Sequence, residues 1–410
     1  MMDQPAMTDQ NEQKQMEKAE QHAQIPVEDP ATAPDTLTDY HKEGDHARLS
    51  SALSSLVSKS ASSGESVMMN LLAPATGVIK KSGWLDMSKN AFSVMGNYAD
   101  SWNYGNYVIV RKTGEKKWES MPLYARIGMH LLFVGRAERT LLEDGYLHTL
   151  FKKESVQSGL NFENPASAAN IPHFVSVYKL PLEDLLEPDL TKYKNFNDFF
   201  ARRLKPDARI IEGKGDETVF TSPADCRCTV FQTIDLATQY WIKGKKFTLG
   251  NLIDDDELAK KYVGGNIGLF RLAPQDYHRF HSPADCTVGT VHDITGTYYT
   301  VNPMAVHEDL NVFTENKRSV MQLHHTRSSI PILFVAIGAL LVGSIEWTVK
   351  EGEKVGKGDE LGCFKYGGST VIVVWPEELG VEFDQDLVEN SISRMETVVE
   401  VGNRVGTMKT

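Results

Sequence analysis

The sequence predicts an α+β protein in which an N-terminal helical segment packs on a compact, turn-rich β core. Between residues 66 and 185, apolar residues recur at the spacing of an amphipathic helix. From residue 215 onward, short runs of β-branched and aromatic residues alternate with Gly, Pro and Asp, which is typical of strands joined by turns. A Ser-Pro-Ala-Asp-Cys motif at 222–226 returns at 282–286. This echo predicts two similar turn-to-strand corners in one β core.

The composition is that of an ordinary globular protein and excludes several function classes. The 410 residues are 41% hydrophobic and 24% charged, so a core can form without metals or disulfides to hold it together. Four cysteines are too few for a disulfide scaffold and suit a reducing compartment. The net charge of −12 argues against a general nucleic-acid binder, because such a protein needs a basic face.

The first 65 residues are predicted to form a disordered acidic tail. They contain twelve Asp/Glu against five Lys/Arg, and Tyr40 is their only aromatic residue. Such a segment cannot bury enough apolar surface to fold. It has neither the apolar core of a signal peptide nor the basic composition of a transit peptide. We therefore expect a protein that is neither secreted nor imported into the mitochondrial matrix.

The region 66–185 is expected to be mainly helical. Within the segment 121–133, apolar residues fall at i, i+4 and i+8 from Leu123. One interpretation is a helix that packs on the core. The other is a basic amphipathic helix that rests on an anionic membrane surface. A second helix is predicted over 139–153.

The remainder, 186–410, is expected to be a β-rich domain. Its run 330–345 is apolar, yet it is shorter than the ~20 residues that a membrane-spanning helix needs. Pro331, Gly338 and Gly343 interrupt this run, so two buried strands around a glycine turn are predicted. Further predicted strands lie at 228–231, 267–270, 297–301, 370–375 and 397–401.

Three polar clusters hold residue types that could perform chemistry. Asp225, in the first Ser-Pro-Ala-Asp turn, could equally cap backbone N–H groups. His278 and His281 lie three residues apart; no third ligand follows at a recognisable spacing, so acid–base use is favoured over a metal site. Ser369 follows two glycines and precedes a β-branched run. It could be a nucleophile if a base lies near it, or simply part of a bend that enters a strand.

Taken together, these clusters resemble the phosphatidylserine decarboxylase family, and most closely its type II eukaryotic branch. The resemblance extends from about residue 111 to residue 406. The segments that carry it stand in the family's order at 196–206, 222–228, 241–247, 270–281, 299–304, 338–345, 361–370 and 394–397. The resemblance implies that the β-rich domain 186–410 is catalytic.

The resemblance also implies that the chain makes its own cofactor, a pyruvoyl group derived from Ser369. The family's cut maps between Gly368 and Ser369. It would divide the precursor into a β chain, 1–368, and an α chain, 369–410, which stay associated. The pyruvoyl group would then serve as an electron sink during decarboxylation, the logic that pyridoxal phosphate also uses.

The self-cleavage site implied by the resemblance is a triad. Ser369 would attack the carbonyl of the preceding glycine, His281 would be its base, and Asp225 would hold His281 in the correct tautomer. Asp285, four residues after His281, is the alternative orienting acid. The family's orienting acid stands in the earlier motif, however, which favours Asp225. His278 is the candidate donor that protonates the substrate carbon after CO2 has left.

The implied reaction converts phosphatidylserine to phosphatidylethanolamine and CO2. The implied partners are this lipid and, through peripheral contact, the cytoplasmic face of an endomembrane; neither nucleic acid nor a bound metal is expected, and a homodimer is left open. Type II enzymes usually carry a C2 domain, for which a chain of this length has no room. The region 66–146 would therefore have to make the membrane contact.

Three alternatives stay open on the sequence. Some relatives use the same pyruvoyl group to decarboxylate aromatic L-amino acids such as tryptophan. A non-catalytic β-domain protein would use the two corners for binding, and its Asp, His and Ser residues would be structural. A hydrolase could use Asp225, His281 and Ser369, although Ser369 lacks the Gly-x-Ser-x-Gly sequence of a nucleophile elbow.

Overall fold

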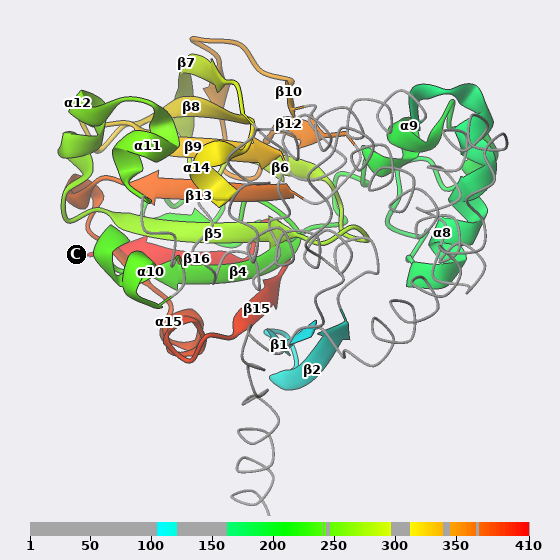
Figure 1. Ribbon diagram of the computed structural model, residues 1–410, viewed down its shortest axis with the longest axis horizontal. Coiled ribbons are helices and arrows are strands. Elements are labelled where there is room, and N and C mark those ends of the chain that lie inside the picture. Colours follow the sequence, from blue (N-terminus) through cyan, green and yellow to red (C-terminus); the bar gives the residue numbers. More distant parts are fainter. Residues whose placement is uncertain are drawn as a thin grey trace, which may run out of the picture. The chain divides into compact units, whose positions relative to one another are not determined.

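The structure is a computed structural model that describes residues 105–120, 162–240, 242, 247–296, 312–338, 345–365 and 369–409. The chain divides into two units, 1–49 and 50–410, and every described residue belongs to the second. Within the described residues the fold is α+β, with a large β-sheet and short helices (Figure 1). This confirms the predicted class. The predicted acidic tail, 1–65, lies outside these residues.

The largest element is a ten-stranded sheet with the order β11-β7-β8-β9-β13-β5-β4-β15-β1-β2. Its neighbouring strands are antiparallel except for β1 and β15, which are parallel. The strands are β1 (Gly105–Val110), β2 (Glu115–Ser120), β4 (Cys226–Phe231), β5 (Asn266–Leu272), β7 (Cys286–Ile294), β8 (Arg318–His325), β9 (Ile332–Gly338), β11 (Lys354–Val355), β13 (Ser369–Trp375) and β15 (Glu396–Val399).

Strand β13 occupies the middle of this sheet. It pairs with β9 on one side and with β5 on the other, and all seven of its residues are buried. Its β-branched residues favour extended backbone, and a strand covered on both faces needs no polar alternation. The strand predicted at 370–375 is therefore confirmed, and it begins one residue earlier, at Ser369.

Two three-stranded sheets complete the β core. One has the order β10 (Ile345–Trp347), β12 (Glu360–Phe364) and β6 (Arg279–His281); the other has the order β14 (Val381–Phe383), β16 (Arg404–Met408) and β3 (Val219–Thr221). Phe280 of β6 packs against Phe334 of β9 and Phe364 of β12. Buried apolar residues of all three sheets form one cluster, so burial of this shared core stabilises them together.

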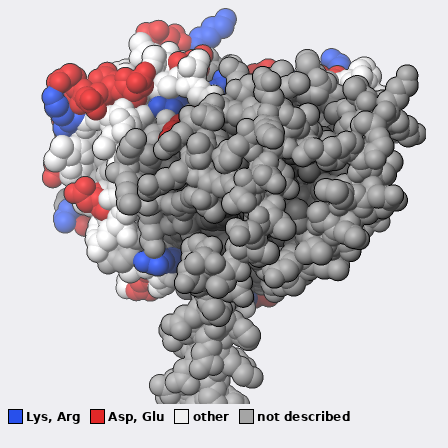
Figure 2. Space-filling model, viewed as in Figure 1, with Lys and Arg blue, Asp and Glu red and all other residues white. Residues whose placement is uncertain are grey.

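The described part of the chain also contains short helices. They are α8 (Ile171–Tyr178), α9 (Phe196–Phe200), α10 (Ile234–Tyr240), α11 (Leu249–Ile253), α12 (Asp256–Ala259), α14 (Val312–Glu315) and α15 (Gln385–Ile392), with 3-10 turns η5 (Pro165–Asn170), η6 (Leu190–Lys192), η7 (Lys260–Tyr262) and η8 (Glu377–Leu379). Acidic atoms gather at the upper left of Figure 2, where Figure 1 places α12. The exposed residues 254–257 before and within α12 are all acidic.

The region 66–185 is not uniformly helical where the structure describes it. Helix α8 lies within it as expected, but β1 and β2 form an antiparallel hairpin there. A turn with Gly114 at φ +71° joins the two strands, and glycine adopts this conformation without steric cost. The overlooked signal is that Tyr107 is followed directly by three β-branched residues, 108–110. The helices predicted over 121–133 and 139–153 lie outside the described residues.

The apolar run 330–345 begins as a strand rather than a membrane helix. Strand β9 fills its first half, and β10 begins at its last residue; 339–344 lie outside the described residues. Within the described part of the chain, no helix is long and apolar enough to cross a bilayer. The predicted strands at 228–231, 267–270, 370–375 and 397–401 fall on β4, β5, β13 and β15, while 297–301 is not described.

The two predicted Ser-Pro-Ala-Asp corners are present, and their turns have matching hydrogen bonds. The Ser222 hydroxyl donates to the carbonyl of Ala224 at 2.8 Å, and the Ser282 hydroxyl donates to that of Ala284 at 2.6 Å. Each turn leads directly into a strand of the large sheet, β4 after the first and β7 after the second. The repeated sequence therefore folds into a repeated local structure.

The two corners are also joined to each other by a reciprocal pair of backbone hydrogen bonds. The N–H of Thr221 donates to the carbonyl of Pro283 at 3.0 Å, and the N–H of His281 donates to that of Pro223 at 2.7 Å. Thr221 and His281 each stand directly before their own Ser-Pro-Ala-Asp turn. The second bond brings His281 beside the turn that contains Asp225.

Candidate active site

Ser369 opens the central strand β13. It faces Leu272 of β5 and Gly338 of β9 in the register, and it is fully buried. Within the described residues its hydroxyl has no hydrogen-bond partner. A buried polar group without a partner costs about 1–3 kcal/mol, so such a group in a well-packed strand calls for a functional explanation.

His281 ends β6, and both of its ring nitrogens have partners. Nδ1 donates to the carbonyl oxygen of Gly358 at 2.8 Å, because that oxygen can only accept. Nε2 therefore carries a lone pair and accepts from the Tyr277 hydroxyl at 3.2 Å. Burial raises the pKa of Tyr277, so this hydroxyl keeps its proton. The tautomer with Nε2 as an acceptor is the one that a general base needs.

The charge state of His281 follows from its surroundings. Burial lowers the pKa of His281 below its ordinary value. The hydrogen bond to Gly358 and the charges of Glu360 and Asp225 oppose this shift without cancelling it. The imidazole is therefore neutral at pH 7, and its Nε2 lone pair is available once the Tyr277 hydroxyl moves away.

Asp225 lies in the turn beside His281, but its hydrogen bonds go elsewhere. Its carboxylate accepts a two-pronged contact from Arg209, with the shortest distance of 2.6 Å from Nη2, and a bond from the Val401 N–H at 2.9 Å. In this described part of the chain, Asp225 and His281 share no hydrogen bond. The carbonyl of Gly358 holds the ring, and the orienting role of Asp225 stays a prediction.

Asp285, the alternative orienting acid, accepts from the Lys357 N–H at 2.8 Å. This bond is the counterpart of the bond between Asp225 and the Val401 N–H. In both cases the capped residue stands directly before a glycine with positive φ, Gly358 or Gly402. Among the described residues, no arginine contacts Asp285 as Arg209 contacts Asp225. Sequence reasoning missed Arg209; its signal is weak, because sixteen residues and an irregular segment separate it from Asp225.

His278 is fully buried in the connection between β5 and β6. Its Nδ1 donates to the carbonyl of Asp276 at 2.9 Å, and its ring lies 3.9 Å from that of Phe200, centroid to centroid. Its own carbonyl accepts from the N–H of Phe364, at the end of β12, at 2.9 Å. Phe364 precedes Ser369 by five residues in the chain, and the residues 366–368 between them are not described.

Arg202 fixes the loop before His278. It is buried, and its Nη2 donates to the carbonyls of Gln275 and Asp276 at 3.0 and 2.9 Å. Burial lowers the pKa of Arg202 to about 10, which leaves it charged at neutral pH. Its guanidinium also lies over the ring of Phe199, 5.2 Å from the centroid. These partners are internal, so Arg202 supports the loop.

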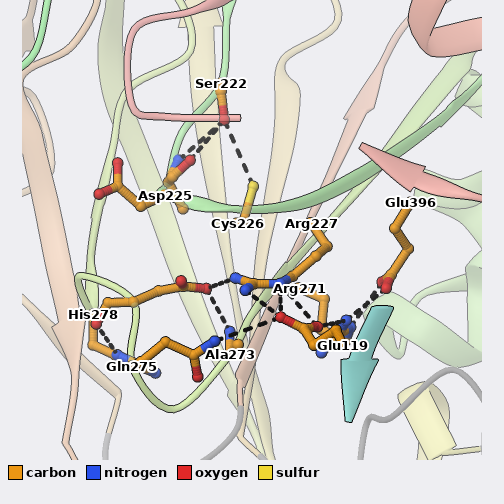
Figure 3. A network of polar contacts seen from close by, with 12 residues as sticks. Glu119, Ser222, Asp225, Cys226, Arg227, Arg271, Ala273, Gln275, His278 and Glu396 are labelled. Carbon is orange, nitrogen blue, oxygen red and sulfur yellow. Dashed lines mark hydrogen bonds and ion pairs between the residues drawn. The ribbon is translucent and has the colours of Figure 1, made fainter. Parts of the chain in front are cut away.

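A buried network of charges lies beside this loop (Figure 3). Arg227 contacts the carboxylates of Glu119 and Asp276, while Arg271 contacts Glu119 at 3.1 Å and Glu396 at 2.5 Å. Buried charges are retained when they are paired in this way. Sequence reasoning missed this network. Its signal is that Arg227 and Arg271 each interrupt an apolar strand, as Cys-Arg-Cys and Phe-Arg-Leu.

The described structure thus gathers Asp225, His278 and His281 around the β5–β6 connection. It places Ser369 at the first position of β13, opposite Leu272, the last residue of β5. Gly368, the predicted cleavage partner, lies outside the described residues. The arrangement offers a buried hydroxyl, a neutral imidazole with a lone pair on Nε2, and a second buried imidazole. These groups suit proton transfer to and from a nucleophile at Ser369.

Known proteins are similar in sequence to the region of the chain that carries these residues. A family model described as phosphatidylserine decarboxylase matches residues 196–407. A "Phosphatidylserine decarboxylase proenzyme" of Fusobacterium nucleatum is 38% identical over 308 residues, which are 73% of this chain and 97% of that protein. A "Phosphatidylserine decarboxylase proenzyme 2" of Komagataella phaffii is 44% identical over 315 residues, 76% of this chain and 31% of that protein.

The eukaryotic relatives are longer than the matched part. A "Phosphatidylserine decarboxylase proenzyme 2" of Saccharomyces cerevisiae is 41% identical over 314 residues, which cover 76% of this chain and 27% of that protein. Across the fungal and plant relatives with the highest similarity, the matched part spans 27% to 45% of their length. The similarity therefore concerns the domain that carries the site.

Proposed function

The chain belongs to the phosphatidylserine decarboxylase family, and from this premise we propose that it is a self-processing, pyruvoyl-dependent decarboxylase that converts phosphatidylserine to phosphatidylethanolamine and CO2. The observation that carries the proposal is the place of Ser369. A buried hydroxyl without a hydrogen-bond partner in the described residues stands at the first position of a central strand. The family's cut would fall directly before it.

The residues around Ser369 fit a pyruvoyl group made from it. Pairing of β13 with β5 and β9 would hold the group at the end of the strand after cleavage. Among the described residues the buried Ser369 hydroxyl has no hydrogen-bond partner, which fits a position that is used for a covalent conversion. When formed, the group supplies a carbonyl that binds the amine of the substrate and delocalises the electron pair left by CO2.

In the proposed cleavage, His281 acts as the base for Ser369. Its tautomer is already correct, because the Gly358 carbonyl holds the proton on Nδ1. Nε2 would exchange its bond from Tyr277 for one from Ser369 and accept the hydroxyl proton as Oγ attacks the Gly368 carbonyl. The amide bond between Gly368 and Ser369 then breaks, and the Ser369 nitrogen takes the proton from His281, which leaves an ester. Loss of the Ser369 Cα proton eliminates the Gly368 carboxylate from this ester, and water converts the remaining dehydroalanine to pyruvoyl with release of ammonia. Asp225 would stabilise the imidazolium through its negative charge.

We assign His278 the protonation of the substrate carbon. Its Nδ1 proton is committed to the carbonyl of Asp276, so the transferred proton would have to come from Nε2 of an imidazolium. Because His278 is fully buried next to Phe200, it would hold this proton away from bulk water. This protects the transfer against leakage.

The proposed substrate is a bilayer lipid, so the enzyme would act at a membrane surface, which we place on the cytoplasmic face of an endomembrane. The exposed acidic residues 254–257 would repel anionic headgroups, and we expect the face that carries α12 to point away from the bilayer (Figure 2). The two chains formed by cleavage would stay associated, since β13 would remain paired on both sides.

Intact-mass analysis of the purified chain tests the proposal. We expect two fragments that meet between Gly368 and Ser369, with the smaller one blocked at its N-terminus by the pyruvoyl group. Ser369→Ala should give one uncleaved, inactive chain, and Ser393→Ala, an exposed serine of the same segment, should be processed normally. Turnover of phosphatidylserine in vesicles against free tryptophan then identifies the substrate. A parent chain that stays intact and inactive would refute the proposal.

A further inference from the structure

Glu119 stands out because it joins the site from outside the segment that matches the family model, 196–407. It lies near the end of β2, at the edge of the large sheet. We propose that Glu119 is a positioning residue: together with Arg227 it fixes Asp276, and thereby the loop that carries His278. The link from Glu119 to the loop follows from contacts; its effect on catalysis rests on the proposed function.

Two arginines of neighbouring strands lie directly opposite each other in the large sheet. Arg227 of β4 and Arg271 of β5 are direct cross-strand partners, so their like charges face each other. Glu119 accepts from both: from Arg227 Nε at 2.9 Å and from Arg271 Nη2 at 3.1 Å. One carboxylate therefore neutralises a repulsion that the strand pairing creates. Burial, the largest influence, favours the neutral acid, yet the two guanidiniums hold the pKa of Glu119 down at about 2.

Arg227 connects Glu119 to the loop that carries His278. Arg227 Nη1 contacts the carboxylate of Asp276, which also accepts from the Ala273 N–H at 2.7 Å. The N–H of Asp276 in turn donates to the carbonyl of Ala273 at 2.9 Å. Asp276 thus closes the turn after β5 on itself, and its own carbonyl accepts from Nδ1 of His278. Whatever orients the Asp276 carboxylate therefore orients His278.

Arg271 connects Glu119 to the strand that contains Ser369. Arg271 is the cross-strand partner of Thr370, and Leu272 is that of Ser369. Arg271 is held by Glu396 through Nε and Nη2, and by Glu119 through Nη2. The hairpin of β1 and β2 thus supports both the loop with His278 and the end of β5 that pairs with Ser369.

The test separates local positioning from global stability. In the full-length Ser369→Ala chain, which cannot be cleaved at this site, we compare Glu119→Gln with Glu115→Gln, an exposed glutamate of the same strand. Hydrogen exchange of the segment 273–281 should become about tenfold faster in Glu119→Gln and stay unchanged in Glu115→Gln. Exchange of β16 should not respond in either variant. Equal exchange of 273–281 in parent and Glu119→Gln overturns the inference.

The same substitutions in the cleavable chain connect the loop to chemistry. Glu119→Gln should slow self-cleavage about tenfold and lower kcat more than it changes KM, because the lipid surface is untouched. If Glu119→Gln does not fold, Glu119→Asp keeps the charge with a shorter reach, and it should show smaller changes in the same direction; unchanged exchange in that variant also refutes the inference. A parent that never self-cleaves refutes the proposed function, while the exchange measurement still decides the role of Glu119.

Discussion

The two Ser-Pro-Ala-Asp corners have nearly the same backbone and different chemistry. In both, the serine hydroxyl closes the turn, the acid caps a backbone N–H beside a glycine turn, and the preceding residue donates to the proline carbonyl of the opposite corner. The preceding residue is Thr221 in the first corner and His281 in the second. The reciprocal bonds place His281 beside Asp225 and Thr221 beside the turn of Asp285.

The two corners differ in the residue that stands before each turn. Thr221 is buried, and its hydroxyl has no hydrogen-bond partner among the described residues, whereas His281 is held at both ring nitrogens. A threonine cannot take up a proton near neutral pH, and an imidazole can. In the proposed function, the chemistry of the second corner would therefore depend on one side chain rather than on the turn.

Substitution of the residue that precedes each turn should give the largest difference in self-cleavage rate between the two corners. Removal of a general base costs about 10²–10⁴-fold, so we expect His281→Ala to slow self-cleavage by at least about 100-fold. Thr221→Val, which keeps the shape and removes an unpartnered hydroxyl, should change the rate less than about threefold. The fraction of cleaved chain against time on a denaturing gel gives both rates. Comparable losses in the two variants would mean that the corners act structurally.

Neutralisation of the two acids should give the next largest difference. Asp225→Asn should slow self-cleavage about 10–100-fold through loss of the charge that stabilises the His281 imidazolium. The effect should be smaller than in hydrolase triads, because the Gly358 carbonyl still orients the ring. Asp285→Asn should have little effect on the rate. The reverse order would assign the orienting role to Asp285 instead.

The pH dependence of self-cleavage should give the smallest but most diagnostic difference. The pKa of His281 lies below its ordinary value of 6.5, so its neutral form predominates above pH 6.5 and is lost as pH falls through the lowered pKa. We expect a flat rate near pH 8 and a decline whose midpoint lies below pH 6.5. Asp225 opposes the lowering, so Asp225→Asn should move the decline to still lower pH. A decline that begins above pH 7 would contradict His281 as the base.

Much of the fold was accessible from local sequence patterns. The β-branched run at 370–375 and the repeated Ser-Pro-Ala-Asp turns each determine their structure within a few residues, and both are found as predicted. The hairpin of β1 and β2 was missed because its pattern spans only six residues per strand in a region with helical periodicity nearby. Short strands owe their identity to the sheet that receives them.

The site could be predicted only as far as residue type carries chemistry. Ser369, His278, His281 and Asp225 attract attention by their sequence motifs. The partners that set their states do not: Gly358 acts through its carbonyl, which any residue possesses. Glu119 lies 108 residues from Arg227, and no local pattern reports such a pairing. The sequence therefore predicts the reactive groups better than it predicts the groups that hold them.

The position of β13 has a consequence for how the mature protein can come into being. The segment after the proposed cut contributes β13, β14, β15 and β16. In the large sheet, β13 and β15 each lie between two strands of the larger piece, whereas β16 lies between β14 and β3. Apart from the larger piece, the buried strands β13 and β15 would therefore lose both of their partner strands. We expect the two pieces not to exchange between molecules and not to assemble when they are produced separately. In the proposed maturation, the smaller chain would therefore have to fold as part of the uncut precursor, before the chain is cleaved.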